Sequence, residues 1–249
     1  MSEITPPSRI GLLREPLGAL ELPRLLWRAG DLASAPRGAG EPVMVLPGYS
    51  ASDASTFVLR SYLRLLGYSV LGWGLGRNNG EVPTLIPRVA QSVSALAEQT
   101  GQRVRLIGWS LGGYLAREAA RERPRAVECV VTLGSPVVGG PKYTVVGRYY
   151  ARQGYDLDEI EAAVAKRDQT PLAIPVTAVY SRADGVVAWR ACIDSTNEGV
   201  EHVEVTTTHL GLGFSPEVYR IVAERLAARG LRDEAPKRKR ETKKGERRS

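Results

Sequence analysis

The sequence contains very few cysteines and histidines, and each scarcity narrows what the protein can do. The only two cysteines in the 249 residues, Cys129 and Cys192, are too few for a disulfide framework. Cys129 lies in an apolar run, so we expect buried free thiols, which suit a reducing compartment. The only two histidines are His202 and His209, so any histidine that serves as a general base must be one of them.

Long hydrophobic runs are missing as well. No apolar stretch approaches the length of a membrane-spanning helix. The N-terminus has neither the basic start nor the continuous apolar core of a secretory signal, so we expect no export by that route. We therefore expect a cytoplasmic protein with at most a peripheral contact to the membrane. With 43% hydrophobic residues, the chain is long enough for one well-buried domain plus extensions.

The positive charge of the chain is unevenly distributed. The formal net charge is +7, and residues 233–249 account for +4 of it, with eight basic and four acidic side chains. This tail has too little apolar surface to fold alone, so we expect a disordered end. Its cations predict at most a weak contact with an anionic membrane surface. A solvated end that does not bind nucleic acid is the simpler interpretation.

What the sequence does contain is a strand, a turn and a helix around one serine. Residues 104–107 form an apolar run that predicts a buried strand, and a helical pattern follows Leu111. Between them, Gly108-x-Ser110-x-Gly112 is typical of a nucleophile elbow, a turn so tight that the serine hydroxyl points outward. The pattern alone also fits an ordinary turn with a capping serine, so the downstream residues must decide.

Two later strands each end near a residue that could complete a catalytic triad. The strand predicted over 176–180 is followed by Asp184, and the strand predicted over 200–205 by His209. Because the carboxyl ends of parallel strands meet at one edge of a sheet, we expect these residues to gather near Ser110.

The chemistry requires these residue types. A serine hydroxyl becomes a good nucleophile when a histidine takes its proton, and an acid on the other ring nitrogen fixes the histidine tautomer. Asp184 could instead be a turn residue before Gly185, but its position at a strand end favours the acid. His202 lies inside a predicted strand, where it would face core or solvent, so His209 is the predicted base.

An oxyanion needs preorganised N–H donors. The backbone N–H of Leu111, directly after the serine, is one candidate. The backbone N–H of Tyr49 is the second, because Pro47-Gly48-Tyr49 follows the strand predicted over 43–46. We therefore predict an oxyanion hole formed by Tyr49 and Leu111.

The motifs together resemble the lipase/esterase branch of the α/β-hydrolase superfamily, over about residues 43–229. This resemblance implies hydrolysis of a carboxylic ester through an acyl-serine, without metal or organic cofactor. The leucine-rich N-terminus, the apolar loops and the tyrosine-rich insertion favour a hydrophobic acyl group, or a lipid, over a charged substrate. The oxyanion loop departs from the family pattern, because Pro47-Gly48 stands where many lipases have His-Gly. The residues that carry the resemblance are Leu46-Pro47-Gly48-Tyr49, Gly72-Trp73-Gly74-Leu75-Gly76-Arg77-Asn78, Gly108-Trp109-Ser110-Leu111-Gly112-Gly113, Thr132-Leu133-Gly134-Ser135-Pro136, Tyr180-Ser181-Arg182-Ala183-Asp184-Gly185-Val186-Val187 and His209-Leu210-Gly211.

The alternation of strands and helices predicts an α/β fold, with a mostly parallel sheet of about six strands and helices on both faces. Residues 35–232 form the expected hydrolase domain, and residues 1–34, the N-terminal segment, are expected to be helical and packed on it. Residues 137–175, the cap segment, interrupt the alternation and predict a small cap or lid with a helix over 157–166.

Two other functions fit the same sequence. An acyltransferase would form the same acyl-enzyme and pass the acyl group to an alcohol or amine instead of water. A non-catalytic, hydrolase-like binding protein is the other alternative, although a binding module has no need of three matched catalytic groups. The sequence leaves the oligomeric state open.

Overall fold

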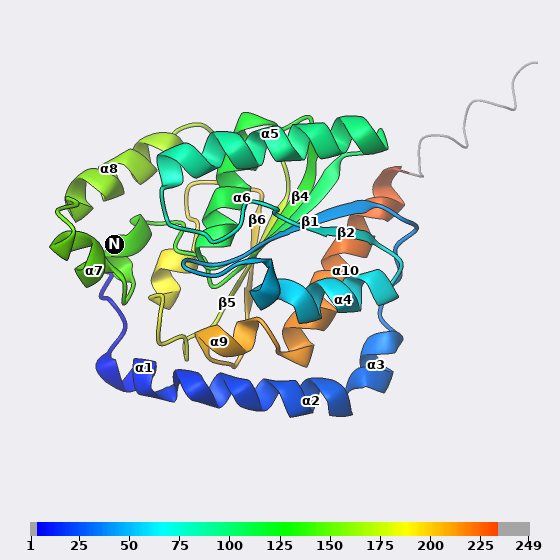
Figure 1. Ribbon diagram of the computed structural model, residues 1–249, viewed down its shortest axis with the longest axis horizontal. Coiled ribbons are helices and arrows are strands. Elements are labelled where there is room, and N and C mark those ends of the chain that lie inside the picture. The colour runs from blue at the N-terminus through cyan, green and yellow to red at the C-terminus, as the bar shows by residue number, and fades with distance from the viewer. Residues whose placement is uncertain (1–3, 234–249) are drawn as a thin grey trace, which may run out of the picture.

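The computed structural model describes residues 4–233 and contains a six-stranded, all-parallel sheet with helices around it (Figure 1). The spatial order is β2-β1-β3-β4-β5-β6. The predicted α/β architecture is confirmed. The strands are β1 (Pro42–Leu46), β2 (Ser69–Gly72), β3 (Val104–Trp109), β4 (Val127–Leu133), β5 (Val176–Tyr180) and β6 (Val200–Glu204).

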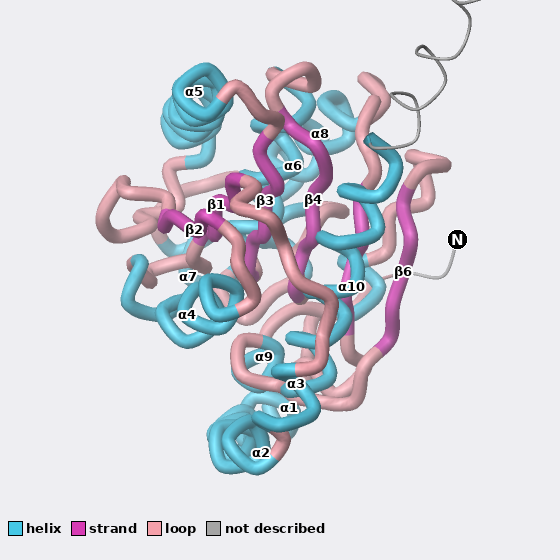
Figure 2. The backbone as a smooth tube through the Cα atoms, turned by 90° about the vertical axis from the view of Figure 1, so that its right-hand side faces the viewer, coloured by secondary structure: helices cyan, strands magenta, loops and turns pink. Residues whose placement is uncertain are grey.

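Helices cover both faces of the sheet, as Figure 2 shows from the side. The helices α5 (Val82–Thr100) and α6 (Leu111–Glu122) pack on one face, and α4 (Phe57–Leu65) and α10 (Pro216–Asp233) pack on the other. Each face buries its own apolar cluster, so the central strands are hydrophobic throughout, as strands covered on both sides must be.

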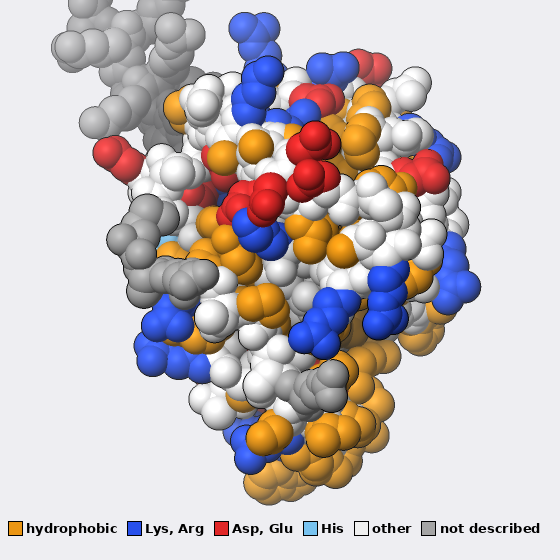
Figure 3. Space-filling view, turned by 90° about the vertical axis from the view of Figure 1, so that its left-hand side faces the viewer, with side chains coloured by type: hydrophobic (Ala, Val, Ile, Leu, Met, Phe, Trp, Pro, Cys, Tyr) orange, Lys and Arg blue, Asp and Glu red, His pale blue; other side chains and the backbone are white. Residues whose placement is uncertain are grey.

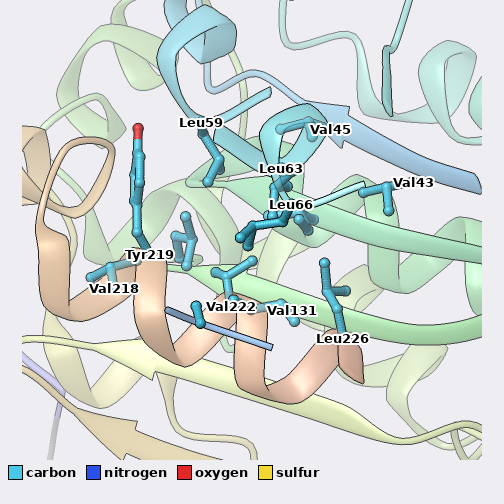
Figure 4. Packing of buried hydrophobic residues seen from close by; sticks show 14 of the residues in the cluster. Val43, Val45, Leu59, Leu63, Leu66, Val131, Val218, Tyr219, Val222 and Leu226 are labelled. Carbon is cyan, nitrogen blue, oxygen red and sulfur yellow. The ribbon is translucent and has the colours of Figure 1, made fainter. Parts of the chain in front are cut away.

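The cluster beneath α4 and α10 shows how the helical spacing of the sequence becomes packing. Leu59 and Leu63 on α4 and Val222 and Leu226 on α10 are all at most 3% exposed. They meet at one face of the sheet, against valines of the central strands (Figure 4). This packing fixes the strands whose carboxyl ends carry the candidate site.

The cap segment contains three helical elements, η3 (Gly140–Tyr143), α7 (Gly147–Arg152) and α8 (Leu157–Asp168). Of these the sequence predicted only α8, which begins where the Asp156 carboxylate accepts hydrogen bonds from the N–H groups of Asp158 and Glu159. The short elements η3 and α7 have no helical pattern long enough to predict them.

The far end of α8 is fixed to α6 by buried charges. Arg121 on α6 contacts Asp168 at 2.7 Å, and Arg167 contacts Glu118 of α6 at 2.5 Å. Arg117 of α6 lies between two carboxylates, Asp168 at 3.2 Å and Asp194 at 2.7 Å, and is 1% exposed. The cap segment is therefore anchored to the same helix that follows Ser110.

The N-terminal segment forms a rod along the lower edge of the molecule in Figure 1. It buries Leu25 and Leu32 against the body, together with the carboxylates of Glu15 and Glu21. Most of its other large apolar side chains are exposed. Its elements are α1 (Arg9–Arg14), η1 (Glu15–Leu20), α2 (Glu21–Trp27) and α3 (Ala29–Ala33).

Three short elements complete the described chain: η2 (Asp53–Thr56), η4 (Trp189–Cys192) and α9 (His209–Leu212). Both cysteines are buried, and neither forms a disulfide with another described residue. Within residues 4–233, no helix combines the length and the apolar character needed to cross a membrane. The predicted basic tail, residues 233–249, lies outside the described residues except for its first one.

Candidate active site

Ser110 lies at a strained turn between β3 and α6. Its φ is 54°, and only one other described non-glycine residue, Ser50, has a positive φ. A side chain at Gly108 would collide with the backbone of Gly113, and one at Gly112 with the carbonyl oxygen of Leu46. The two glycines thus permit the close approach that a nucleophile elbow requires.

The loop after β1 passes directly beside this turn. β1 pairs with β2 on one side and with β3 on the other. Successive strands are therefore added on opposite sides of β1, which makes this the switch point of the sheet. A Cβ on Gly48 would lie 3.3 Å from the Cβ of Ser110. Ligands of open α/β sheets bind at such switch points, at the carboxyl ends of the strands.

The two candidate oxyanion donors lie on either side of this contact. Tyr49 follows Gly48, and Leu111 follows Ser110 as the first residue of α6. Among the described residues, neither backbone N–H donates a hydrogen bond. Both residues line the same cavity as Ser110, so these donors are free to meet a substrate oxygen there.

A buried asparagine, whose role the sequence did not predict, holds the Tyr49 loop. The side chain of Asn78 is fully buried, donates to the carbonyl oxygen of Pro47 at 3.0 Å and accepts from the N–H of Gly80. Its backbone carbonyl oxygen accepts from the N–H of Ser50 at 2.7 Å. A glycine-rich loop thus fixes the backbone next to the nucleophile, and its sequence alone does not assign this role to Asn78.

Asp184 and His209 are in direct contact. Asp184 Oδ2 lies 2.6 Å from Nδ1 of His209, and both residues are 8% exposed. The other carboxylate oxygen accepts from the N–H groups of Val186 and Val187 at 2.8 and 2.7 Å. The acid is therefore held with one oxygen toward the imidazole, which favours the tautomer that leaves Nε2 without a proton.

Gly134, at the end of β4, makes room for this pair. Its φ is +56°, and a side chain there would meet Asp184 Oδ2 at 3.0 Å and His209 Nδ1 at 3.1 Å. The residue belongs to the predicted strand-end motif around 132–136, but its contact with the pair follows only from the fold.

A second feature missed by the sequence is a buried glutamate from the N-terminal segment. Glu15 is 8% exposed, and its Oε1 accepts from the N–H of Gly185 at 2.7 Å and from the N–H of His209 at 3.0 Å. Its Oε2 accepts from the N–H of Leu210 at 2.7 Å. One carboxylate therefore joins the loop of Asp184 to the helix that begins at His209.

The other histidine lies away from these groups. His202 is in β6, and its Nε2 accepts a hydrogen bond from the N–H of Asp194 at 2.9 Å. Burial lowers the pKa of His202 below its ordinary value, and the nearby charge of Arg117 acts in the same direction. Within residues 4–233, no three His, Cys, Asp or Glu side chains are grouped so that they could hold a metal ion.

Ser110 and His209 line one cavity of about 690 Å³. No hydrogen bond joins their side chains among the described contacts, and such bonds are commonly long until substrate is bound. The cavity wall is largely apolar and includes Ile86 of α5 and Ile160 and Val164 of α8. The cap segment thus forms one side of the space above the serine.

The cavity also contains a group of tyrosines. Tyr49 and Tyr150 both line it, with ring centroids 5.9 Å apart, and Tyr155 packs against Tyr150 at 5.4 Å. Burial raises the pKa of Tyr150 to about 12, so its phenol is neutral at physiological pH. Together with the aliphatic wall, these rings give the cavity the character of a site for an uncharged, hydrophobic group.

Comparison with known sequences gives a short match. No protein-family model matches the chain. A pimeloyl-[acyl-carrier protein] methyl ester esterase of Edwardsiella ictaluri is 37% identical over 62 residues. The match spans 25% of this chain and 23% of that protein, so it covers less than a quarter of the relative's length.

Comparison with solved structures identifies the fold. A lipase of Bacillus licheniformis, BlEst2 in its mature form, superposes with a TM-score of 0.58 at 16% identity, covering 78% of this chain and 94% of the lipase. The mouse alpha/beta hydrolase domain-containing protein 10 gives a TM-score of 0.53 at 17% identity, covering 79% and 91%. At such low identity, these similarities establish a common architecture and leave the chemistry to be argued from the site.

Proposed function

We propose, on the premise that this chain has the α/β-hydrolase fold, that the protein is a carboxylic ester hydrolase with Ser110, Asp184 and His209 as its triad. The observation that carries the proposal is the 2.6 Å contact between Asp184 and His209 beside the cavity that Ser110 lines. The strained elbow at Ser110 and the two unoccupied N–H groups at Tyr49 and Leu111 support it.

In the first step, Ser110 Oγ attacks the carbonyl carbon of the ester while His209 Nε2 takes the hydroxyl proton. The negative charge that forms on the carbonyl oxygen is stabilised by the N–H groups of Tyr49 and Leu111. The tetrahedral intermediate then breaks its bond to the alcohol, which leaves with the proton from His209. Asp184 keeps the imidazole oriented and stabilises its protonated form.

In the second step, a water molecule attacks the acyl-serine and gives its proton to His209. The same oxyanion donors act again, and the carboxylic acid leaves as Ser110 recovers its proton. An alcohol or amine in place of water would give the acyltransferase reaction, so analysis of the products must separate the two.

The substrate class follows from the cavity. An apolar wall and neutral phenols favour a hydrophobic acyl group over a charged one. Relatives that are named esterases and lipases agree with an ester as substrate. We therefore propose an ester with a hydrophobic acyl chain, or a lipid, and we propose the cap segment as the part that contacts that chain.

The proposal also includes the cellular location of the protein and the contacts of its basic tail. Two buried cysteines that form no disulfide in the described chain suit a reducing, cytoplasmic environment. The basic residues of the tail, 233–249, would give at most a weak contact with an anionic membrane surface, and nucleic acid is not a proposed partner.

A fluorophosphonate probe tests this function, because it reacts with an activated serine and with few other groups. We expect the wild-type protein to be labelled and to hydrolyse a series of acyl esters with a preference for hydrophobic chains. The Ser110→Ala variant should lose both properties and keep its melting temperature. Labelling or turnover that survives in this variant would mean that another residue is the nucleophile. A wild-type protein that is neither labelled nor active would favour the alternative of a non-catalytic binding protein.

A further inference from the structure

The N-terminal segment leaves most of its large apolar side chains in solvent. Its inward face buries Leu25 and Leu32 together with two carboxylates, Glu15 and Glu21, which are 8% and 6% exposed. Its outward face carries large apolar side chains, with Leu13, Leu26 and Trp27 exposed by 79%, 78% and 84%. Such an arrangement leaves a continuous apolar surface without a partner among the described residues.

This outer face has a defined composition and place. In the space-filling view, the lower end of the molecule, over the N-terminal helices, is almost entirely hydrophobic (Figure 3). Figure 2 places the rod beyond α9, at the outer edge of the body. We call this surface the leucine face. It is formed by the exposed side chains of Ile10, Leu12, Leu13, Leu17, Leu20, Leu22, Leu26 and Trp27.

Most of the charged side chains that the N-terminal segment exposes to solvent are positive. Arg14, Arg24 and Arg28 are exposed, whereas two of the three acidic residues between positions 4 and 34 are buried, and one of these, Glu21, pairs with Arg24 at 3.0 Å. The third, Asp31, is paired with Arg28 at 2.5 Å. Leucines and a tryptophan flanked by arginines on a helical rod are the features of a segment that lies in the plane of a membrane interface.

We propose that the leucine face binds the surface of an anionic lipid bilayer, with the rod lying parallel to the membrane. A second copy of the chain is the competing occupant, and the oligomeric state of the wild type and of the triple variant distinguishes it from a bilayer. The rod begins beside the candidate site, since Gly11 packs on Gly185, which precedes the cavity-lining Val186. Bilayer contact would therefore bring the cavity close to the lipid surface.

The test is vesicle binding by the full chain and by Leu13→Gln/Leu17→Gln/Trp27→Gln. These side chains are exposed, so the variant should keep the wild-type melting temperature. The wild type should bind vesicles of phosphatidylcholine mixed with phosphatidylglycerol. The affinity of the variant for the same vesicles should be on the order of 100-fold lower. A matched control, Leu65→Gln/Leu71→Gln, removes exposed leucines outside the N-terminal segment and should bind as wild type does.

A second measurement separates the leucine face from the basic tail. Trp27 is far more exposed than Trp73, Trp109 or Trp189, so phospholipids brominated in their acyl chains should quench wild-type emission and leave Trp27→Phe much less quenched. Binding should persist in part at about 0.5 M salt, where contacts between exposed charges are screened. Unchanged binding by the triple variant, no wild-type binding, or a dimer that the variant breaks would each overturn the proposal.

An independent observation concerns Glu15, whose carboxylate bridges the two loops of the candidate triad. These loops are 24 residues apart in sequence, and Glu15 accepts three of their backbone N–H groups. Backbone contacts reinforce the bridge: a side chain at Gly18 would collide with the N–H of Gly211, and one at Gly185 with the carbonyl of Gly11. The distance between Asp184 and His209 thus depends on a residue outside the hydrolase domain.

We infer that Glu15 is a positioning residue for Asp184 and His209, an inference that rests on the proposed function. In Glu15→Gln, the amide retains one acceptor oxygen, and its NH₂ group must face a buried N–H. We expect kcat to fall on the order of 10- to 100-fold with KM changed much less, because small displacements of catalytic groups are costly. Glu15→Asp, which keeps the charge on a shorter side chain, should recover part of the loss.

Glu21→Gln is the matched control. Glu21 is equally buried on the same rod, but it accepts from the hydroxyl of Thr207 and from Arg24, not from the loops' backbone next to the triad. The control should lose comparable melting temperature and keep kcat within about twofold. Equal losses of kcat in both variants would make Glu15 merely structural and overturn the inference.

Proton NMR keeps this test separate from the proposed function. The proton between His209 Nδ1 and Asp184 should give a low-field signal in the wild type, whatever reaction the protein performs. Glu15→Gln should shift or broaden this signal and Glu21→Gln should leave it in place. An unchanged signal in Glu15→Gln would contradict the inference even if the protein had no esterase activity.

Discussion

The cap segment and the N-terminal segment both lie outside the alternation of strands and helices, yet they present opposite faces to the body. The cap segment turns apolar side chains such as Ile160 and Val164 inward, toward the cavity. The N-terminal segment turns Glu15 and Glu21 inward and leaves Leu13 and Trp27 exposed. The two segments border the same site. The cap segment would contact the substrate, whereas the N-terminal segment would position the catalytic residues.

Their anchors differ in the same way. The cap segment is held by ion pairs between side chains, in which Arg167 and Asp168 contact α6. The N-terminal segment is held by carboxylates that accept backbone N–H groups and a hydroxyl. The first anchor fixes a wall of the cavity, and the second fixes the backbone that carries Asp184 and His209. We therefore expect damage to the cap segment to change substrate preference and damage to the N-terminal segment to change turnover.

Removal of a catalytic residue should give the largest loss of kcat, and this loss is the reference for changes in both segments. Ser110→Ala and His209→Ala should each lower kcat on the order of 10⁴-fold or more, and the double variant should lose little more, because the two groups act as a unit. His202→Ala should retain most activity, since its ring is bonded to the N–H of Asp194 away from the cavity. Steady-state hydrolysis of one soluble ester measures all four. Reversed results for the two histidines would contradict the assignment of the base.

The anchor of the cap segment should give the next largest effect, on stability. Arg117→Leu leaves the carboxylates of Asp168 and Asp194 without their shared partner in a buried site. Removing one member of a buried ion pair typically costs about 3–5 kcal/mol, which denaturant unfolding can measure. The control is Arg182→Leu, whose partner Glu204 is exposed, with an expected cost below about 1 kcal/mol. Equal costs would mean that the buried cluster does not anchor the cap.

A smaller effect separates the cap segment from the rest of the cavity wall. Ile160→Trp adds bulk where α8 lines the cavity, so it should shift preference toward short acyl chains, by about 10-fold or more in relative kcat/KM. Ala162→Trp places the same ring on the exposed side of α8 and should leave the chain-length profile unchanged. An unaltered profile in Ile160→Trp, together with a large loss of melting temperature, would make the cap segment purely structural.

The smallest effect is a pH dependence of stability at His202. Burial and Arg117 lower its pKa, so the folded protein resists protonating this ring, while the unfolded chain binds the proton at its ordinary pKa of about 6.5. The unfolded state then holds more protons, and stability falls as the pH drops from about 7.5 to about 5. Melting curves of His202→Gln should show a weaker fall over the same range. Parallel curves would exclude His202 as the source.

The strands and the elbow could be predicted from the sequence because local patterns determine them. An apolar run followed by Gly108-x-Ser110-x-Gly112 contains the strand, the turn and the close approach, and β5 has the predicted bounds. Asp184 and His209 follow the ends of parallel strands, so topology alone brings them to one edge. Their contact of 2.6 Å also depends on supporting hydrogen bonds that no local pattern predicts.

The supporting residues could not be predicted, because their roles depend on distant backbone. Asn78 binds the carbonyl of Pro47, 31 residues away, and Glu15 binds the N–H of His209, 194 residues away. Glu15 lies in no motif, and the motif that contains Asn78 does not reveal which backbone group its side chain binds. The short helix α9 was also missed, since four residues are too few for a helical pattern.

The central claim is that Ser110 carries the acyl group, and capture of that intermediate tests it most directly. A hydrophobic ester is mixed with the wild-type protein, and the reaction is quenched in acid during the first turnover. The protein is then digested, and the peptide masses are measured by mass spectrometry. The peptide containing Ser110 should gain the mass of the acyl group, and no such adduct should form in Ser110→Ala. Turnover of the ester with the acyl group on another residue, or with no adduct even when deacylation is slowed, would contradict it.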